Sequence, residues 1–207
     1  MSKYLYLFFI AISFLCISDV YYTAAMTDSI DISDKKTVIN NIPYEKEIVI
    51  NDHNFNGKVT LTRMKTYRAF RLELKTMQDS SLSSLMYKYD IYRLEKGDIN
   101  GYGSIDVLIG IIKPARFDPV VRRRLFILQI DQNTLRPLWL GTKMCRELVD
   151  FTVCKVHKLD QIKTIEKESN GLFCIGLYSW SQFGLSLIKY LKSNITLVNA
   201  EEELNHV

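Results

Sequence analysis

A loop rich in oxygen-bearing side chains, followed directly by an apolar run, constrains the fold of this chain more than any other segment. In residues 98–106 these side chains alternate with other residues around two glycines, Gly101 and Gly103. Residues 107–112 follow without a break and are apolar and rich in β-branched side chains. Such a run is typical of a strand that is buried on both faces. The segment therefore predicts a tight corner that leads into a central β-strand.

The spacing of the oxygens in this loop also suits a hard cation. Ca²⁺ takes about six to eight oxygen ligands, and a tight loop supplies them from alternate positions. In this chain the alternate positions hold Asp98, Asn100, Tyr102, Ser104 and Asp106, so the middle position lacks a carboxylate. The alternative is that the same side chains only hydrogen-bond the backbone of their own turn while the glycines supply positive φ angles.

The residues around the loop decide which class of calcium loop it can belong to. An EF-hand has helices on both sides and an acid at its twelfth position, but here that position is Ile109, within a strand-like run. Residues 97–110 resemble instead the aspartate-rich calcium loop of FG-GAP and VCBS-type repeats, which occur in integrin-like β-propellers and in many secreted bacterial proteins.

The resemblance implies a ligand set. Asp98, Asn100 and Asp106 would bind Ca²⁺ through their side chains, and Ser104 would bind it through its carbonyl oxygen. Tyr102 departs from the family's pattern, and the missing negative charge implies weak or absent binding. We therefore expect a weak Ca²⁺ site formed by these four ligands.

The resemblance also bears on the fold class. Repeats of this kind form blades of about four strands, and several blades close a ring. A chain of 207 residues is too short for such a ring. We expect a mainly β domain of antiparallel meanders and hairpins that resembles incomplete propeller blades, and the alternative is a β-sandwich.

Alternating and apolar segments predict a succession of strands separated by turn residues. Asn56-Gly57 is a strong signal for a tight hairpin turn, and residues 131–134 predict a second hairpin. The expected strands are 46–50, 58–63, 68–74, 87–94, 107–112, 125–130, 135–140, 148–156, 162–167 and 172–178.

Three other segments interrupt this series. Residues 78–84 have the composition of a long surface loop, and two prolines break the segment 113–124. Residues 184–197 have apolar spacings that fit a helix or a strand. We therefore expect irregular connections in the first two segments. For the third segment, helix and strand remain as alternatives.

The N-terminus has the features of an export signal. Residues 4–17 form an apolar run of fourteen, which is short for a membrane span and has the length of a signal-peptide core. We expect a signal peptide over 1–25 and an extended leader over 26–41, and the alternative is an uncleaved anchor. Both place the protein outside the cytosol, in the periplasm, on the envelope or secreted. A β-rich domain is expected over 42–200 and a flexible acidic tail over 201–207.

Charge and cysteine content narrow the function classes. The formal net charge of +4 is too small and too dispersed to indicate a nucleic-acid-binding protein. Without the signal, Cys145, Cys154 and Cys174 remain, an odd number that argues against a disulfide framework and allows one bridge at most. We expect them to be small buried residues. The histidines are too scattered for a structural zinc site.

For two groups of side chains, a binding role has to be weighed against an ordinary structural role. The basic run 122–124, with Lys113 and Arg116 nearby, is expected to be a solvated loop and not a patch for anionic polymers or lipid headgroups. Four aromatic residues are expected to lie in the core and not on a sugar-binding surface. They are Trp139, Tyr178, Trp180 and Phe183.

The sequence contains no local signature of catalysis: no glycine-flanked nucleophilic serine, no zinc-binding His-Glu helix and no phosphate loop. We therefore expect a non-catalytic secreted or envelope-associated protein that binds an envelope or extracellular macromolecule, with membrane contact only through an uncleaved N-terminus. The alternative is an extracytoplasmic carbohydrate hydrolase, for which two acids such as Asp118 and Asp150 would have to converge. A third interpretation is a structural piece of an envelope assembly, which would expose a large apolar patch.

Overall fold

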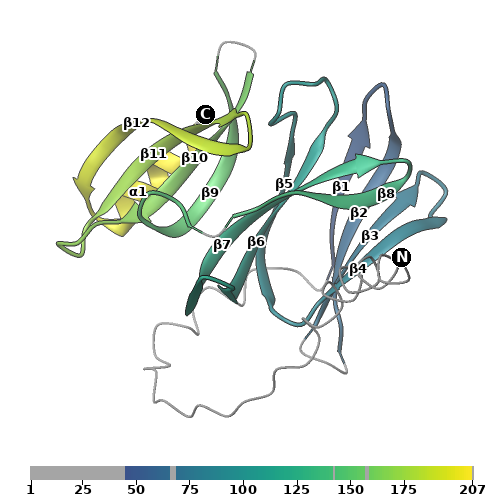
Figure 1. Cartoon of the computed structure of the whole chain (residues 1–207), viewed down its shortest axis with the longest axis horizontal. Helices are drawn as coiled ribbons and strands as arrows, with labels where there is room; N and C mark the ends of the chain where they lie inside the picture. The colour runs from purple at the N-terminus through teal and green to yellow at the C-terminus, as the bar shows by residue number, and fades with distance from the viewer. Residues whose placement is uncertain (1–44, 66–68, 142, 157–158, 207) are drawn as a thin grey trace, which may run out of the picture. The chain divides into compact units, whose positions relative to one another are not determined.

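Twelve antiparallel strands and one helix make up the part of the chain that the computed structural model describes, residues 45–65, 69–141, 143–156 and 159–206 (Figure 1). The strands fall in chain order into three sheets of four. Within each sheet, every strand pairs with its neighbour in sequence, so each sheet is a meander. The fold is therefore mainly β, as the sequence predicts.

The elements follow one another without a crossover. The first sheet contains β1 (Glu45–Asn51), β2 (Asn56–Arg63), β3 (Phe70–Thr76) and β4 (Ser81–Tyr87). The second contains β5 (Asp90–Gly97), β6 (Asp106–Ala115), β7 (Asp118–Asp131) and β8 (Thr134–Leu140). The third contains β9 (Glu147–Val156), β10 (Leu159–Lys167), β11 (Phe173–Ser181) and β12 (Gly184–Ile195), and helix α1 (Leu197–Asn205) follows it. All described residues belong to one compact unit, 35–207.

Two apolar cores hold the three sheets together, and the second sheet contributes to both. Side chains alternate along β6. Val107, Ile109 and Ile111 lie in the core shared with the first sheet, and Leu108 lies in the core shared with the third sheet. All four are fully buried. The run at 107–112 is thus a central strand buried on both faces, as its composition predicts.

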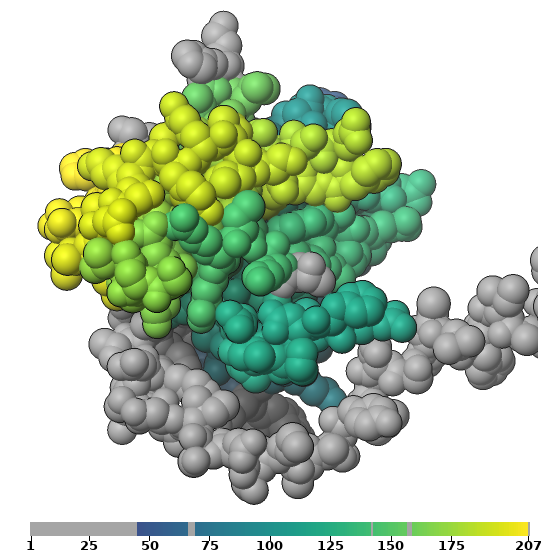
Figure 2. Space-filling view, turned by 60° about the vertical axis from the view of Figure 1, so that its left-hand side comes forward, coloured from purple at the N-terminus to yellow at the C-terminus, as the bar shows by residue number. Residues whose placement is uncertain are grey.

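Helix α1 covers apolar side chains of the third sheet. Thr196 caps the helix, and Ala200 and Leu204, which lie one turn apart on the same side, are buried with Ile165. Figure 2 shows the C-terminal strands and the helix, coloured yellow, together at the surface. The flexible tail expected over 201–207 is therefore wrong for the residues up to Asn205, because two apolar side chains at helical spacing find a place on the sheet.

The first hairpin turns at a different place from the one predicted. Asn56 and Gly57 are already part of β2, and the turn lies before them. Asp52 makes this turn, because its Oδ1 accepts the N–H groups of Asn54 at 2.8 Å and Phe55 at 2.9 Å. A side chain that closes its own backbone turn in this way competes well with an Asn-Gly turn.

Three other segments are more regular than the sequence suggests. β4 begins at Ser81, inside the loop expected over 78–84, because its serines occupy an edge strand where polar side chains face water. The irregular connection expected over 113–124 is a hairpin, with β7 beginning at Asp118. Most of the segment 184–197, which fits a helix or a strand by its spacing, forms β12.

The hairpin predicted over 131–134 is confirmed. Gln132 and Asn133 have φ angles of 48° and 59°, which is the left-handed region that a tight hairpin turn needs. The cysteine prediction is confirmed for Cys154 and Cys174, which are buried, but Cys145 is exposed, and all three thiols are free.

The predictions for the signal peptide over 1–25 and the leader over 26–41 concern residues outside the described part of the chain. Within the described residues, no helix has the length and the apolar character needed to cross a membrane.

Candidate functional site

The oxygen-rich loop joins β5 to β6 and therefore has a strand on each side, as predicted. Gly101 and Gly103 have φ angles of 76° and 83°, which glycine adopts without strain. Asp98 accepts the N–H of Gly103 through Oδ2 at 2.8 Å, and Asn100 accepts the N–H of Tyr102 through Oδ1 at 3.0 Å. The loop is thus closed by its own side chains.

The other two predicted ligands lie at the end of the loop. Asp106 begins β6, is only 1% exposed, and accepts the N–H of Ile99 through Oδ2 at 3.2 Å. The hydroxyl oxygen of Ser104 accepts a hydrogen bond from the side-chain amide of Asn54, in the β1–β2 turn. The structure therefore brings the four predicted site residues into one loop and pairs their side chains with nearby N–H groups.

Aspartates tie all three sheets together at this loop. Asp52, from the turn of the first sheet, accepts the N–H of Ile105 through Oδ2 at 2.7 Å. Asp160, on β10 of the third sheet, accepts the N–H of Asp98 through Oδ2 at 2.8 Å. Sequence reasoning missed both contacts, because Asp52 looks like an ordinary turn residue and no local signal marks Asp160.

The carboxylates at this junction, where the β5–β6 loop meets Asp52 and Asp160, influence one another's pKa. Burial, together with the negative charges of Asp98 and Asp52, raises the pKa of Asp106 to about 7, against the opposing effect of the N–H groups that it accepts. Burial also acts to raise the pKa of Asp52, but hydrogen bonds from Ile105, Asn54 and Phe55 outweigh it and hold that pKa below its usual range. The junction therefore combines one ionised carboxylate with a second that resists ionisation.

The fit of this loop to a metal ion is incomplete. Among the described residues, no group of three or more His, Cys, Asp and Glu side chains is arranged to hold a metal ion. Asp98 Oδ2, Asn100 Oδ1 and Asp106 Oδ2 accept backbone N–H groups, whereas Asp98 Oδ1 is buried and has no hydrogen-bond partner. A cation ligand is one way to satisfy a buried carboxylate oxygen of this kind.

A second candidate site is a concave surface that we call the basic cleft, formed by two adjoining cavities. The larger has a volume of about 340 Å³ and is lined by β7, the β8–β9 connection and the β10–β11 turn. The cleft carries six basic side chains and three acidic ones. The basic ones are Arg122, Arg123, Arg124, Lys143, Arg146 and Lys167, and the acidic ones are Asp118, Glu147 and Glu168.

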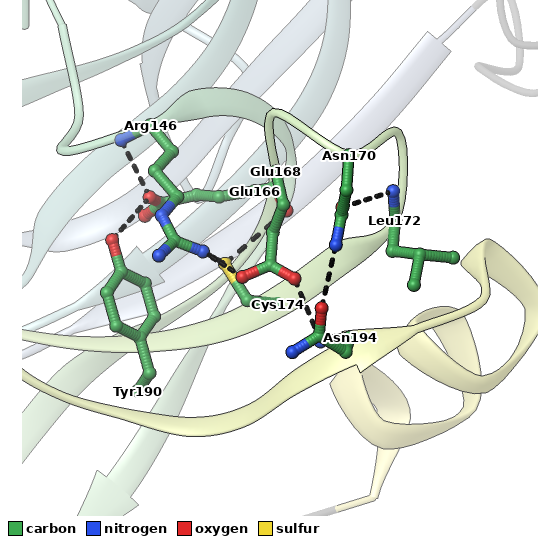
Figure 3. A network of polar contacts seen from close by, with 8 residues as sticks. All are labelled: Arg146, Glu166, Glu168, Asn170, Leu172, Cys174, Tyr190 and Asn194. Carbon is green, nitrogen blue, oxygen red and sulfur yellow. Dashed lines mark hydrogen bonds and ion pairs between the residues drawn. The ribbon is translucent and has the colours of Figure 1, made fainter.

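A buried carboxylate, Glu166, organises the residues beneath the cleft (Figure 3). Its Oε1 accepts hydrogen bonds from the hydroxyls of Tyr178 at 2.6 Å and Thr164 at 2.9 Å. Its Oε2 accepts the backbone N–H of Arg146 at 2.9 Å and the hydroxyl of Tyr190 at 3.4 Å. Glu166 therefore connects the β8–β9 connection to three strands of the third sheet.

The guanidinium of Arg146 is held at the edge of this network. It forms an ion pair with Glu168, lies 4.4 Å from the ring centroid of Tyr190, and donates to the Cys174 sulfur at 3.2 Å (Figure 3). The ion pair with Glu168 raises the pKa of Arg146 above its usual range. Glu168 also accepts the backbone N–H of Asn194 at 2.9 Å, so the pair is anchored on both sides.

Sequence reasoning did not identify Glu166. Its one available signal is its place in β10, two residues after Thr164 and four after Ile162, on the side of the strand that packs toward the second sheet. When the other side chains on one face of a strand point into the core, an acid on that face indicates a buried polar network.

The prediction for the basic run is corrected. The basic run 122–124 is not a freely solvated loop, because Arg124 is only 3% exposed and Arg122 forms ion pairs with Asp118 and Glu147. Asp118 is also paired with Arg124 at 3.1 Å. These ion pairs hold Arg122 and Arg124 in place on β7.

The two acids named for the hydrolase alternative have different partners. Asp118 is held by the arginines of β7, whereas Asp150 binds Arg93 through two hydrogen bonds of 2.7 Å and 2.5 Å. Each carboxylate thus has its own arginine partners, Arg122 and Arg124 for Asp118 and Arg93 for Asp150.

The aromatic prediction is confirmed for three of the four residues. Tyr178 is buried in the second core, and Trp139 and Trp180 pack against that core. Phe183 is 91% exposed in the turn between β11 and β12, so its placement in the core is wrong. Phe183 follows Gln182, whose φ of 49° belongs to a tight turn. The geometry of this turn, and not the apolar character of Phe183, determines where the side chain lies.

Comparison with known proteins adds no family to this description. None of the known protein-family models matches the chain, and no curated protein sequence matches it either.

Proposed function

We propose that this protein is a non-catalytic, secreted or envelope-associated β domain that binds an acidic macromolecule of the envelope or the extracellular space through the basic cleft. The observation that carries the proposal is the excess of basic over acidic side chains in the basic cleft, whose larger cavity has a volume of about 340 Å³. A concave surface lined by one predominant charge concentrates ligands of the opposite charge.

The rigidity of the cleft supports binding. Arg146 is fixed by Glu168, by the ring of Tyr190 and by the Glu166 network. A cation that is already ordered loses little conformational entropy when a ligand arrives, so a larger part of the contact energy remains as affinity. Lys143 and Lys167, in contrast, are exposed at the rim and supply charge that a partner can reach.

Binding to a model polyanion tests this proposal. Dextran sulfate should bind the protein more tightly than uncharged dextran does, and raised salt should weaken the complex because the attraction is electrostatic. The double substitution Lys143→Gln and Lys167→Gln should weaken binding about tenfold, which corresponds to about 1.4 kcal/mol. Lys189→Gln, an exposed lysine of β12 that lines neither cavity, is the matched control.

Equal affinity for dextran sulfate in the double variant and the control would refute binding at the cleft. The location is tested separately. Cell fractionation should recover the protein outside the cytosol, and recovery in the cytosol would contradict the export part of the proposal.

A weak Ca²⁺ site in the β5–β6 loop is a second proposal, carried by the buried and unpartnered Asp98 Oδ1. An ion that binds only the folded state raises the melting temperature. We expect Ca²⁺ to raise the melting temperature relative to chelator, and Mg²⁺ to raise it less because it demands tighter geometry. Asp98→Asn should abolish the Ca²⁺ effect. An unchanged melting temperature in millimolar Ca²⁺ would leave the loop as a turn closed by hydrogen bonds alone.

A further inference from the structure

The hairpin between β6 and β7 ends in an exposed apolar tip. Phe117, in the turn, is 83% exposed, and Val120 and Val121 are 50% and 48% exposed. Large apolar side chains that gather at the end of a projecting hairpin gain nothing from the fold itself. Their position therefore calls for a contact outside the described chain.

The backbone of the tip bulges, and the bulge is what exposes the two valines. Ala115 pairs with Asp118, and the next matched pair is Lys113 with Arg122. Between these pairs one strand has a single residue and the other has three, so the extra residues on β7 leave the ladder. Without further support, the unpaired carbonyls of such a bulge would leave the tip mobile.

A buried arginine supplies that support. Arg124 is 3% exposed, and its Nε donates to the carbonyl oxygen of Lys113 at 2.8 Å. Its Nη2 donates to the carbonyl oxygens of Asp118 and Val120, both at 3.1 Å, and to the Asp118 carboxylate at 3.1 Å. One guanidinium thus fixes both strands of the tip, and the exposed apolar side chains are presented in a set conformation.

Positive charge surrounds the apolar tip. The Arg116 guanidinium lies 5.4 Å from the ring centroid of Phe117, and the Lys113 ammonium lies 5.4 Å from the ring centroid of Tyr89. Asp118, the acid within the tip, forms ion pairs with Arg122 and Arg124. Arg116 is exposed beside Phe117, so the tip presents a positive charge that a partner can reach.

We propose that the β6–β7 tip binds the surface of an anionic lipid membrane. Phe117, Val120 and Val121 enter the boundary between headgroups and acyl chains, and Arg116 contacts lipid phosphates. An aromatic and two aliphatic side chains with cations immediately behind them match the apolar and anionic layers of such a surface. This inference does not rest on polyanion binding at the cleft, although Asp118, Arg122 and Arg124 belong to both surfaces, and it adds a membrane contact beyond the N-terminus.

Co-sedimentation with vesicles tests the proposal. The protein should sediment with vesicles of phosphatidylcholine mixed with phosphatidylglycerol, and less with phosphatidylcholine alone. Phe117→Ser should weaken binding to the mixed vesicles about tenfold or more, which corresponds to about 1.4 kcal/mol. Phe183→Ser, which removes a phenylalanine of similar exposure from the β11–β12 turn, is the matched control and should leave binding unchanged.

A second measurement places the tip in the lipid directly. In Phe117→Trp the new indole should shift its emission to shorter wavelength when mixed vesicles are added, and in Phe183→Trp it should not. The two native tryptophans, Trp139 and Trp180, contribute equally to both variants.

Three results would overturn the proposal. They are equal vesicle binding by the native protein and Phe117→Ser, an equal loss in Phe183→Ser, and no emission shift in Phe117→Trp. Loss of dextran sulfate binding in Phe117→Ser without any vesicle binding by the native protein would likewise assign the tip to a polymer and not to lipid.

Discussion

Replacement of Asp106 by asparagine should stabilise this protein at neutral and alkaline pH when no metal is present. Asp106 is 1% exposed, and its pKa is raised to about 7 from an ordinary value of 3.8. A carboxyl group with a raised pKa binds its proton more tightly in the folded state than in the unfolded state. Its contribution to stability is therefore complete below about pH 4 and is lost as the pH rises toward 7.

The size of this loss follows from the shift. A difference of about three pKa units, at about 1.4 kcal/mol for each unit, corresponds to roughly 4 kcal/mol of unfolding free energy lost between pH 4 and pH 8. Asparagine has nearly the same shape and can still accept the N–H of Ile99 through its amide oxygen, but it carries no charge at any pH. In chelator at pH 8, Asp106→Asn should thus be more stable than the native protein by up to roughly 4 kcal/mol.

Urea unfolding of both proteins in chelator, at several pH values from 4 to 8, measures the effect. The difference between them at each pH isolates Asp106 from any other group that titrates in the same range. Added Ca²⁺ should stabilise the native protein at pH 8 and should not stabilise Asp106→Asn. Parallel pH profiles for the two proteins in chelator would refute the claim that burial and the charges of Asp98 and Asp52 oppose ionisation of Asp106.

Three further predictions concern stability and are measured by urea unfolding. Glu166→Ala should lower the unfolding free energy by about 3–5 kcal/mol, because it leaves buried donors of the network unpaired; a loss no larger than that of a surface substitution would show that water replaces the carboxylate. Gly57→Ala should cost about 1–3 kcal/mol, because the new Cβ would lie 2.3 Å from the carbonyl oxygen of Lys75; a neutral effect would mean that the two strands separate easily there. Leu204→Ala should cost about 2–4 kcal/mol if α1 is held by its packing on the sheet; no loss would mean that the helix is loosely attached.

The sequence predicts the regular parts of this fold because their signals are local. The run 107–112 is apolar at every position that faces a core, and alternation along β3 places Leu72 and Leu74 inward. The turn at 131–134 needs two residues with positive φ, and it has them in Gln132 and Asn133. Each of these features depends on near neighbours in the chain.

The features that the sequence does not reveal depend on distant partners. Asp160 meets Asp98 across 62 positions, and Arg93 meets Asp150 across 57 positions. Arg124 looks like part of a solvated basic run until the carbonyl groups that it binds are placed around it. The candidate loop was predictable as a corner between strands, but the contacts that tie it to the other two sheets were not.

The meander order of the strands has a consequence for how this protein folds. Every hydrogen-bonded strand pair joins consecutive segments of the chain. Each sheet can therefore form by closing short loops, which costs little conformational entropy. We expect the two cores to close later, when the meanders dock, and β6 belongs to both cores. Amide protons of β6 should therefore exchange with solvent more slowly than those of the edge strands, because they are exposed only when both docking steps are reversed.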